Sequence, residues 1–375
     1  MIEALTHLTP KTDSLGPGTK LAGLECLRGL AAFYVFAHHF VRRGMPQVPE
    51  LVRVFSFGQV AVMLFFLVSG FVIHFASSEP GAVFNLGHYL QRRIRRLYPP
   101  FLMAMLVTWI GWSLLPITIF RFSYTELFGN LLMLQAEDGP GSSISPFLDN
   151  YPLWSLSYEF WFYIMYGALM WLGGSFERKR ILACVVPLLA TFLDLWQPNQ
   201  ASRFVSYFPL WWLGVELAQL YRQDKKIELK KLGPAAIVLV LPMLARALDL
   251  FLNSEIGRLT LYGHREIALR RFVTVGLLIA IGLLWQALKF RGFWQIFGVF
   301  RWVAPISYAL YVTHAPVLRI AATLSPTHSG LLNFLWICPL VLSVAWVIEV
   351  PIQRAVNRHF PLARTPTPAP QPGAN

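Results

Sequence analysis

Long apolar runs separated by short polar segments recur along most of the chain, from Leu21 to Pro351. Each run has about twenty residues, which is enough for a helix to cross the ~30 Å hydrocarbon core of a bilayer. The pattern therefore predicts an all-α fold, a polytopic membrane helix bundle with about ten transmembrane helices. We expect these helices at residues 24–41, 57–77, 97–118, 151–173, 180–197, 204–221, 234–252, 272–288, 303–322 and 331–351.

The two ends of the chain lack this pattern. Residues 1–20 are rich in Thr, Pro, Gly and Ser and hold no apolar core of a cleaved signal peptide, so we expect a flexible cytoplasmic tail. Residues 356–375 include the sequence PLARTPTPAPQPGAN, which cannot build a core and predicts disorder. Residues 21–355 between them form one predicted membrane domain, and we expect no soluble domain attached to it.

The segment 119–150 fits two interpretations. Its stretch YTELFGNLLMLQ could be an eleventh span, or a re-entrant or surface helix on the outer face. An eleventh span would move the basic clusters at 178–180 and 222–231 to the outside, against the rule that basic loops stay in the cytoplasm. We therefore predict the re-entrant or surface helix.

Composition excludes a soluble protein. Of the 375 residues, 55% are hydrophobic and 14% are charged, and the mean hydropathy is +0.51, whereas soluble domains carry about 25% charged residues. The net charge of +13 does not indicate nucleic acid binding, because most basic residues fall on the side of the bundle that holds both termini. This bias predicts cytoplasmic termini in a multi-pass protein of the inner (cytoplasmic) cell membrane, in contact with lipid.

The three cysteines carry no predicted chemistry. Cys26, Cys184 and Cys338 stand alone in apolar sequence, without the spacing of a disulfide framework or of a zinc site. We expect them to serve core packing, and we expect no metal.

Arg28 and His39 lie eleven residues apart in the first predicted helix. At about 100° per residue they return to within about 20° of one face, ~16 Å apart along the axis, whereas His38 falls on another face. An arginine at the cytoplasmic mouth and a deeper histidine can therefore line one groove. The alternative is a membrane anchor at Arg28 and a core histidine at His39.

Four arginines stand within the sequence RRIRR at 92–96, just before Pro99 and Pro100. Guanidinium groups next to a helix N-terminus make an anion site suited to phosphates, and Arg93 and Arg96 share one helical face. The alternative is that this run only sets the cytoplasmic side of the membrane boundary.

Glu159 lies about two turns inside an apolar helix, at the depth assigned to His39. A carboxylate there could orient the imidazole for general-base chemistry, or could instead pair with an outer arginine. His314 is expected to support the site as a second polar group or through helix–helix hydrogen bonds. Ser69, beside Gly70, favours close helix packing and lacks the strand–turn setting of a nucleophilic serine.

These stretches, in this order, resemble the acyltransferase-3 family of integral membrane acyltransferases over about residues 24–351. Departures from the family pattern occur at Glu25, Cys26, Ala61 and Met63, and at Tyr158, which is bulkier than the residue usual in the family. The resemblance is carried by LRGLAA with the Arg28 to His39 spacing, FFLVSGF at 65–71, Arg93-x-x-Arg96-x-x-Pro99, WSLSYE at 154–159, SYALYVTH at 307–314 and Glu349-x-Pro351.

The resemblance implies O-acylation, mostly O-acetylation, of a carbohydrate such as lipopolysaccharide, another surface polysaccharide or peptidoglycan. The co-substrate would be cytoplasmic acyl-CoA, with acetyl-CoA as the expected donor, and the acceptor would be a glycan or glycolipid presented outside. The expected donor-binding residues are Arg28, Arg93 and Arg96, the expected catalytic residues are His39 and Glu159, and the expected supporting residues are Ser69, Tyr308 and His314.

His39 could act as a general base or could carry the acyl group transiently, and the residues do not separate these roles. A different class of function also fits intramembrane Arg, His and Glu, namely a multi-pass transporter of a small anionic or acylated substrate. The chain contains no visible duplicated half, which disfavours an inverted-repeat transporter. A non-catalytic membrane scaffold is the third alternative.

Overall fold

The protein is described here from a computed structural model, which covers residues 17–77, 83–114, 122–224, 226–253, 263–324 and 329–361. This part of the chain is helical and contains no strand, as predicted. Its ten longest helices, of 17 to 29 residues, overlap the ten predicted segments. They are α1 (Pro17–Gly44), α3 (Gly58–Ser77), α4 (Leu86–Leu114), α6 (Trp154–Trp171), α7 (Phe176–Trp196), α9 (Phe208–Asp224), α10 (Gly233–Asn253), α11 (His264–Ala287), α13 (Ser307–Leu324) and α14 (Gly330–Val347).

Five helical stretches of the described chain are long and apolar enough to cross a membrane, and a pair bent by 46° at α13 would be a sixth. The predicted number of ten spans is therefore not confirmed. Buried helices such as α9, most of whose side chains are covered by neighbouring helices, do not need the apolar surface that lipid contact demands. The five stretches are Pro49–Ser77, Leu86–Leu114, Gly233–Asn253, His264–Ala287 and Gly330–His359.

Several helix boundaries differ from the predictions. Helix α4 begins at Leu86 rather than at 97, so the arginine run lies within the helix, and Pro99 and Pro100 stand inside it. Helix α1 already begins at Pro17, inside the predicted tail. Helix α15 (Gln353–His359) extends into the predicted disordered segment, which is therefore placed too early at 356. The rest of both tails lies outside the described residues.

The described part of segment 119–150 contains a short helix, α5 (Tyr124–Leu131), and no eleventh span. Its eight residues rise only about 12 Å, too little to cross a bilayer. The chain that follows is tied to the bundle by hydrogen bonds: Gln135 donates to the carbonyl of Leu153 at 3.1 Å, and Trp161 donates to that of Met133 at 2.9 Å. The preferred prediction, a re-entrant or surface helix in place of an eleventh span, agrees with the short helix, and its place on the outer face stays a prediction.

Glycines allow a close approach of two helices, α3 and α9. A Cβ atom at Gly70 would overlap the carbonyl oxygen of Trp211, and one at Gly214 would overlap that of Leu67. The predicted packing role of the Ser69–Gly70 pair is therefore confirmed for Gly70. The contact fixes the rotation of α3, and with it the direction in which Ser69 points.

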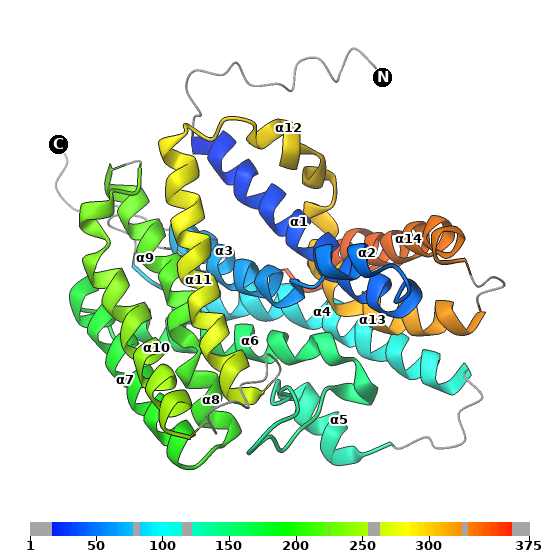
Figure 1. Ribbon diagram of the computed structural model, residues 1–375, viewed down its shortest axis with the longest axis horizontal. Helices are drawn as coiled ribbons and strands as arrows, with labels where there is room; N and C mark the ends of the chain where they lie inside the picture. Colours follow the sequence, from blue (N-terminus) through cyan, green and yellow to red (C-terminus); the bar gives the residue numbers. More distant parts are fainter. Residues whose placement is uncertain are drawn as a thin grey trace.

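Helices α1, α3 and α4 lie at the centre of the molecule (Figure 1). Helices α7, α10 and α11 cover one side, and α13 and α14 cover the other. Cys26 and Cys184 are buried and Cys338 is half-buried, and all three are free thiols, as expected for packing residues. Five helices, α1, α3, α4, α6 and α13, surround the cavity described next.

Candidate functional site

A cavity of about 120 Å³ lies among α1, α3, α4, α6 and α13, and we call it the arginine cavity. Six of the eight site residues predicted from the sequence line it, although they are scattered over 280 residues of chain (28 to 308). Those six are Arg28, Ser69, Arg93, Arg96, Glu159 and Tyr308. The tertiary fold therefore brings most of the predicted site together.

Two of the three arginines in the cavity have no carboxylate partner among the described residues. Arg28 donates from Nη2 to Ser307 Oγ at 3.2 Å. The guanidinium of Arg93 lies over the rings of Tyr89 and Tyr163, at 5.6 and 5.9 Å from their centroids. Aromatic faces hold a cation in place without neutralising it. Both guanidinium groups thus keep donors for an anionic ligand.

The third arginine, Arg96, forms an ion pair with Glu349 and lies over the ring of Tyr308 at 5.6 Å. Glu349 is buried in the π-helical turn Ile348–Ile352, where its Oε2 also accepts from the backbone N–H of Ala309 at 3.0 Å. The pair orients Arg96 and leaves part of its side chain exposed to the cavity. Glu349 was missed as a site residue, although a lone carboxylate in an apolar run was the signal for it.

The other two arginines of the run point elsewhere. Arg92 is exposed, and Arg95 donates to the carbonyl of Phe360 at 2.7 Å. Because Arg93 and Arg96 are three residues apart, they share the helical face that lines the cavity. The predicted face of α4 is thus the one that meets the site.

Glu159 does not contact His39, so the prediction that this carboxylate orients the imidazole is wrong. Glu159 Oε1 instead accepts from Ser69 Oγ at 2.7 Å and from the Tyr163 hydroxyl at 2.5 Å. The two donors also lie 3.1 Å apart, which closes a three-membered polar cluster. The physical reason is helix rotation, because equal depth in a bundle does not determine which neighbouring helix a side chain faces. Tyr163, one turn after Glu159, was missed.

His39 pairs with His314, at a ring-centroid distance of 5.1 Å. His314 is fully buried, and its Nδ1 lies 3.2 Å from the carbonyl of Leu310. A carbonyl can only accept, so Nδ1 carries the proton and Nε2 keeps a free lone pair. Nε2 is buried and has no hydrogen-bond partner. His314 therefore offers an unsatisfied acceptor in the interior, beside the ring of His39.

Tyr311 adjoins both the arginine cavity and the histidine pair. Its ring lines the cavity and lies 6.0 Å from that of His314, and its hydroxyl hydrogen-bonds Ser155 at 2.7 Å. His39 itself is not part of the cavity lining, so Arg28 and His39 do not line one groove in this structure. His38 turns to another face, as predicted, where its Nδ1 meets the carbonyl of Phe55.

Tyr158, the bulky departure from the family pattern, faces away from the arginine cavity. It is fully buried and packs edge-on against Trp154 and Phe204, at centroid distances of 5.5 and 4.8 Å. The departure therefore changes the aromatic core and not the lining. Within the described chain, no three His, Cys, Asp or Glu side chains gather in a way that could hold a metal ion.

Comparison with known proteins shows that the chain is similar to acyltransferases. A family model described as an acyltransferase domain matches residues 21–350. The chain is 31% identical to the acyltransferase MdmB of Streptomyces mycarofaciens over 191 residues, covering 49% of this chain and 48% of that protein. It is 27% identical to an O-acetyl transferase of Shigella phage Sf6 over 195 residues, covering 50% and 56%. The matches thus span about half the length of these relatives, and no solved structure matches the chain.

Proposed function

Because the chain belongs to the acyltransferase family whose model matches residues 21–350, we propose that it is a membrane O-acyltransferase. It moves an acyl group, with acetyl as the expected one, from cytoplasmic acyl-CoA to a hydroxyl of an extracytoplasmic or lipid-linked glycan. The protein would act in the inner cell membrane, with its termini and the arginine run of α4 on the cytoplasmic side.

One observation carries this proposal. Arg28 and Arg93, from two different helices, enter one cavity without a carboxylate partner among the described residues, and Glu159 lies in the same cavity. Guanidinium groups bind phosphate through charge-assisted hydrogen bonds, and coenzyme A carries phosphates at one end and its thioester at the other. The arginines would hold the phosphates at the mouth while the pantetheine arm extends into the bundle.

Glu159 would then position groups in the middle of the cavity. Its carboxylate, held by Ser69 and Tyr163, keeps Tyr163 in place under the guanidinium of Arg93. Arg96, oriented by Glu349, adds a third donor to the same face of α4. Glu159 is therefore proposed as a positioning residue for the donor rather than as the partner of His39.

The reaction is proposed to occur where Tyr311 meets the histidine pair. His39 takes the proton of the acceptor hydroxyl, the hydroxyl oxygen attacks the thioester carbonyl carbon, and the carbon–sulfur bond breaks as the new carbon–oxygen bond forms. The coenzyme A thiolate leaves and takes up the proton from the imidazolium. In the alternative course, His39 first receives the acyl group itself and then passes it to the hydroxyl. Tyr311 must move to connect the cavity with the histidines in either course.

The test uses the full chain in proteoliposomes with acetyl-CoA labelled in its acetyl group and with glycolipid extracted from the host membranes. His39→Ala should lower transfer by about 10²- to 10⁴-fold, because a positioned acid–base group is worth that much. His38→Ala is the neighbouring-histidine control: the His38 Nδ1 meets the Phe55 carbonyl and its ring packs edge-on against His39 at a centroid distance of 5.0 Å, so the variant removes a packing neighbour of His39 but not the proposed base, and it should retain most transfer. Equal thermal unfolding of both variants would exclude a folding defect.

Two results would overturn the proposal. Undiminished transfer by His39→Ala would remove the histidine from the chemistry. Failure of the wild-type protein to attach label to any acceptor, together with movement of intact label across the bilayer, would favour the transporter.

A further inference from the structure

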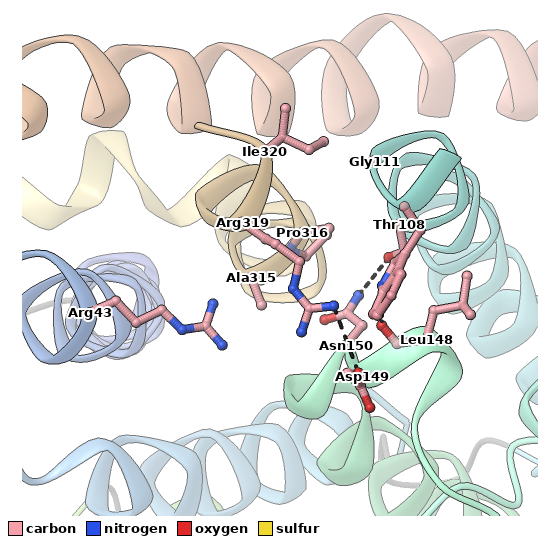
Figure 2. A pocket seen from close by; sticks show the side chains of 11 residues that line it. Arg43, Thr108, Gly111, Leu148, Asp149, Asn150, Ala315, Pro316, Arg319 and Ile320 are labelled. Atoms are coloured by element: carbon pink, nitrogen blue, oxygen red, sulfur yellow. Dashed lines mark hydrogen bonds and ion pairs between the residues drawn. The ribbon is translucent and has the colours of Figure 1, made fainter. Parts of the chain in front are cut away.

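A second pocket lies at the far end of α1 from Arg28 and shares no lining residue with the arginine cavity; Ala315, the residue after His314, lines it, but His39 and His314 do not. Figure 2 shows Arg43 of α1 and Arg319 of α13 extending into the space beside the 148–150 segment. The cavity volume is about 10 Å³, enough for roughly one water-sized group, and the pocket is partly open to the surface. The polar side chains of its lining are Arg43, Thr108, Asp149, Asn150 and Arg319.

The positive charge in this pocket is only partly neutralised by carboxylates of the protein. Arg319 lies 3.8 Å from the half-exposed carboxylate of Asp149 and 4.8 Å above the ring of Trp112. Arg43 has neither an ion pair nor a hydrogen bond to any other described residue. Two guanidinium groups that share one space repel each other, and a bound anion would turn this repulsion into attraction.

Asn150 adds an unsatisfied acceptor to the same pocket. It is buried, and its Nδ2 donates to Thr108 Oγ1 at 3.2 Å and to the carbonyl of Val312 at 3.1 Å. Because the Val312 carbonyl only accepts, the amide nitrogen must face it, and Oδ1 is the atom left over. Asn150 Oδ1 is buried without a hydrogen-bond partner. A hydroxyl group of a ligand would satisfy it.

The pocket lies near the proposed reaction centre, as the spacing of residues along α1 and α13 indicates. Arg43 follows His39 by four residues on the same face of α1, which places it about one turn, roughly 6 Å, beyond the imidazole. On α13, Arg319 follows His314, whose Nε2 has no partner, by five residues, which is about 7.5 Å along the axis and about 140° around it, so the shared face is on α1. A ligand anchored at the two arginines can therefore extend a hydroxyl towards the histidine pair.

We propose that this pocket, lined by Arg43, Arg319 and Asn150, binds a negatively charged group of the acceptor, so that the enzyme acylates an acidic glycan. This inference rests on the proposed function and adds the acceptor class to it. One oxygen of a carboxylate or phosphate enters between the two guanidinium groups, a neighbouring hydroxyl donates to Asn150 Oδ1, and the hydroxyl to be acylated faces His39. The sugar itself remains at the open mouth, because the enclosed volume is too small for a ring.

The experiment follows label from acetyl-CoA into the glycolipid of host membranes, using the full chain in proteoliposomes. The labelled product is separated by anion exchange before and after phosphatase treatment and after chemical reduction of carboxyl groups. We expect an acidic product whose charge is removed by one of the two treatments, which identifies phosphate or carboxylate as the anion. A neutral labelled product would overturn this inference and leave the proposed function standing, whereas no labelled product would overturn both.

Substitutions of the two pocket arginines give a second, kinetic test of the same proposal. Arg43→Gln and Arg319→Gln should each raise the apparent KM for the glycolipid acceptor by about tenfold, through the loss of a charge-assisted contact, and leave the KM for acetyl-CoA unchanged. Arg42→Gln is the matched control: Arg42 and Arg43 are both exposed, but only Arg43 lines the pocket. An unchanged acceptor KM in both pocket variants, or an equal rise in the control, would contradict the assignment.

Discussion

The arginine cavity and a second group of arginines, beside the 132–150 segment, differ in whether each arginine has a carboxylate partner. In the second group, which we call the paired cluster, every arginine lies within 4 Å of a carboxylate. In the arginine cavity only Arg96 does. The paired cluster consists of Glu137, Asp194, Arg203, Arg246 and Arg271, from the segment itself and from α7, α8 (Gln200–Ser206), α10 and α11.

The contacts of the paired cluster are those of a structural element. Arg271 is buried and donates to both carboxylate oxygens of Glu137, at 2.7 and 2.5 Å, while its guanidinium lies 4.5 Å from the centroid of the Trp154 ring. Asp194 is shared by Arg203 and Arg246, at 3.7 and 3.4 Å. These pairs tie the segment after α5 to α11 and to the helices around it.

Cavity volume does not separate the two regions, because a cavity of about 240 Å³ also adjoins the paired cluster. Charge pairing does separate them. A buried arginine beside a carboxylate has its charge balanced within the fold, whereas the charges of Arg28 and Arg93 have no carboxylate partner among the described residues and can be balanced by an anionic ligand. The comparison therefore assigns stability to one region and ligand binding to the other, and each assignment can be tested.

The largest effect is expected from breaking a pair in the paired cluster. Arg271→Ala leaves the carboxylate of Glu137 without its partner in a mostly buried setting, which costs about 3–5 kcal/mol of unfolding free energy. Denaturant unfolding of the purified protein in detergent measures this. Arg270→Ala is the matched control on the exposed face of α11 and should change the unfolding free energy by about 0.5 kcal/mol or less. Equal stability of the two variants would refute the structural assignment.

An intermediate effect is expected in the arginine cavity, on binding rather than on stability. Arg93→Gln removes a donor that would meet a coenzyme A phosphate, and a hydrogen bond to a charged group is worth about 1.5–3 kcal/mol. The apparent KM for acyl-CoA should rise about ten- to hundredfold, with little change in unfolding free energy. Arg92→Gln, one residue away and exposed, should leave the KM as it is. A destabilised Arg93→Gln with an unchanged KM would place Arg93 with the paired cluster instead.

The smallest effect is expected when the pH is lowered, on the free energy of unfolding. Burial raises the pKa of Glu137, but the guanidinium of Arg271 outweighs burial, and the pKa of this carboxyl lies below its usual value. The folded state therefore gains stability from the ionised carboxylate above the ordinary pKa of about 4.3, and loses that gain as the pH falls through the lowered value. Unfolding measured from pH 6 downwards should show this loss for the wild type. In Glu137→Gln the same contribution should be missing at every pH, and an identical pH profile would exclude the pair as its source.

Much of the fold could be predicted from the sequence, because helix formation depends on properties of short stretches of the chain. Apolar runs of helical length predicted ten helices, and the position of the basic clusters at 178–180 and 222–231 predicted that segment 119–150 holds a helix that does not span. The arginine face of α4 followed from the three-residue spacing of Arg93 and Arg96, which the helical period converts into one side. Boundaries such as the start of α4 failed, because the arginine run is polar and yet helical.

The chain by itself determined which side chains are present, how they are spaced along each helix, and therefore which chemistry is available. Only the tertiary structure decided the partners: Glu159 with Ser69 and Tyr163, His39 with His314, and Arg96 with Glu349. The physical reason is that helical spacing fixes directions within one helix, whereas the rotation of one helix against another depends on packing. Contacts such as that of α3 with α9 at Gly70 involve residues far apart in sequence, and no single helix encodes them.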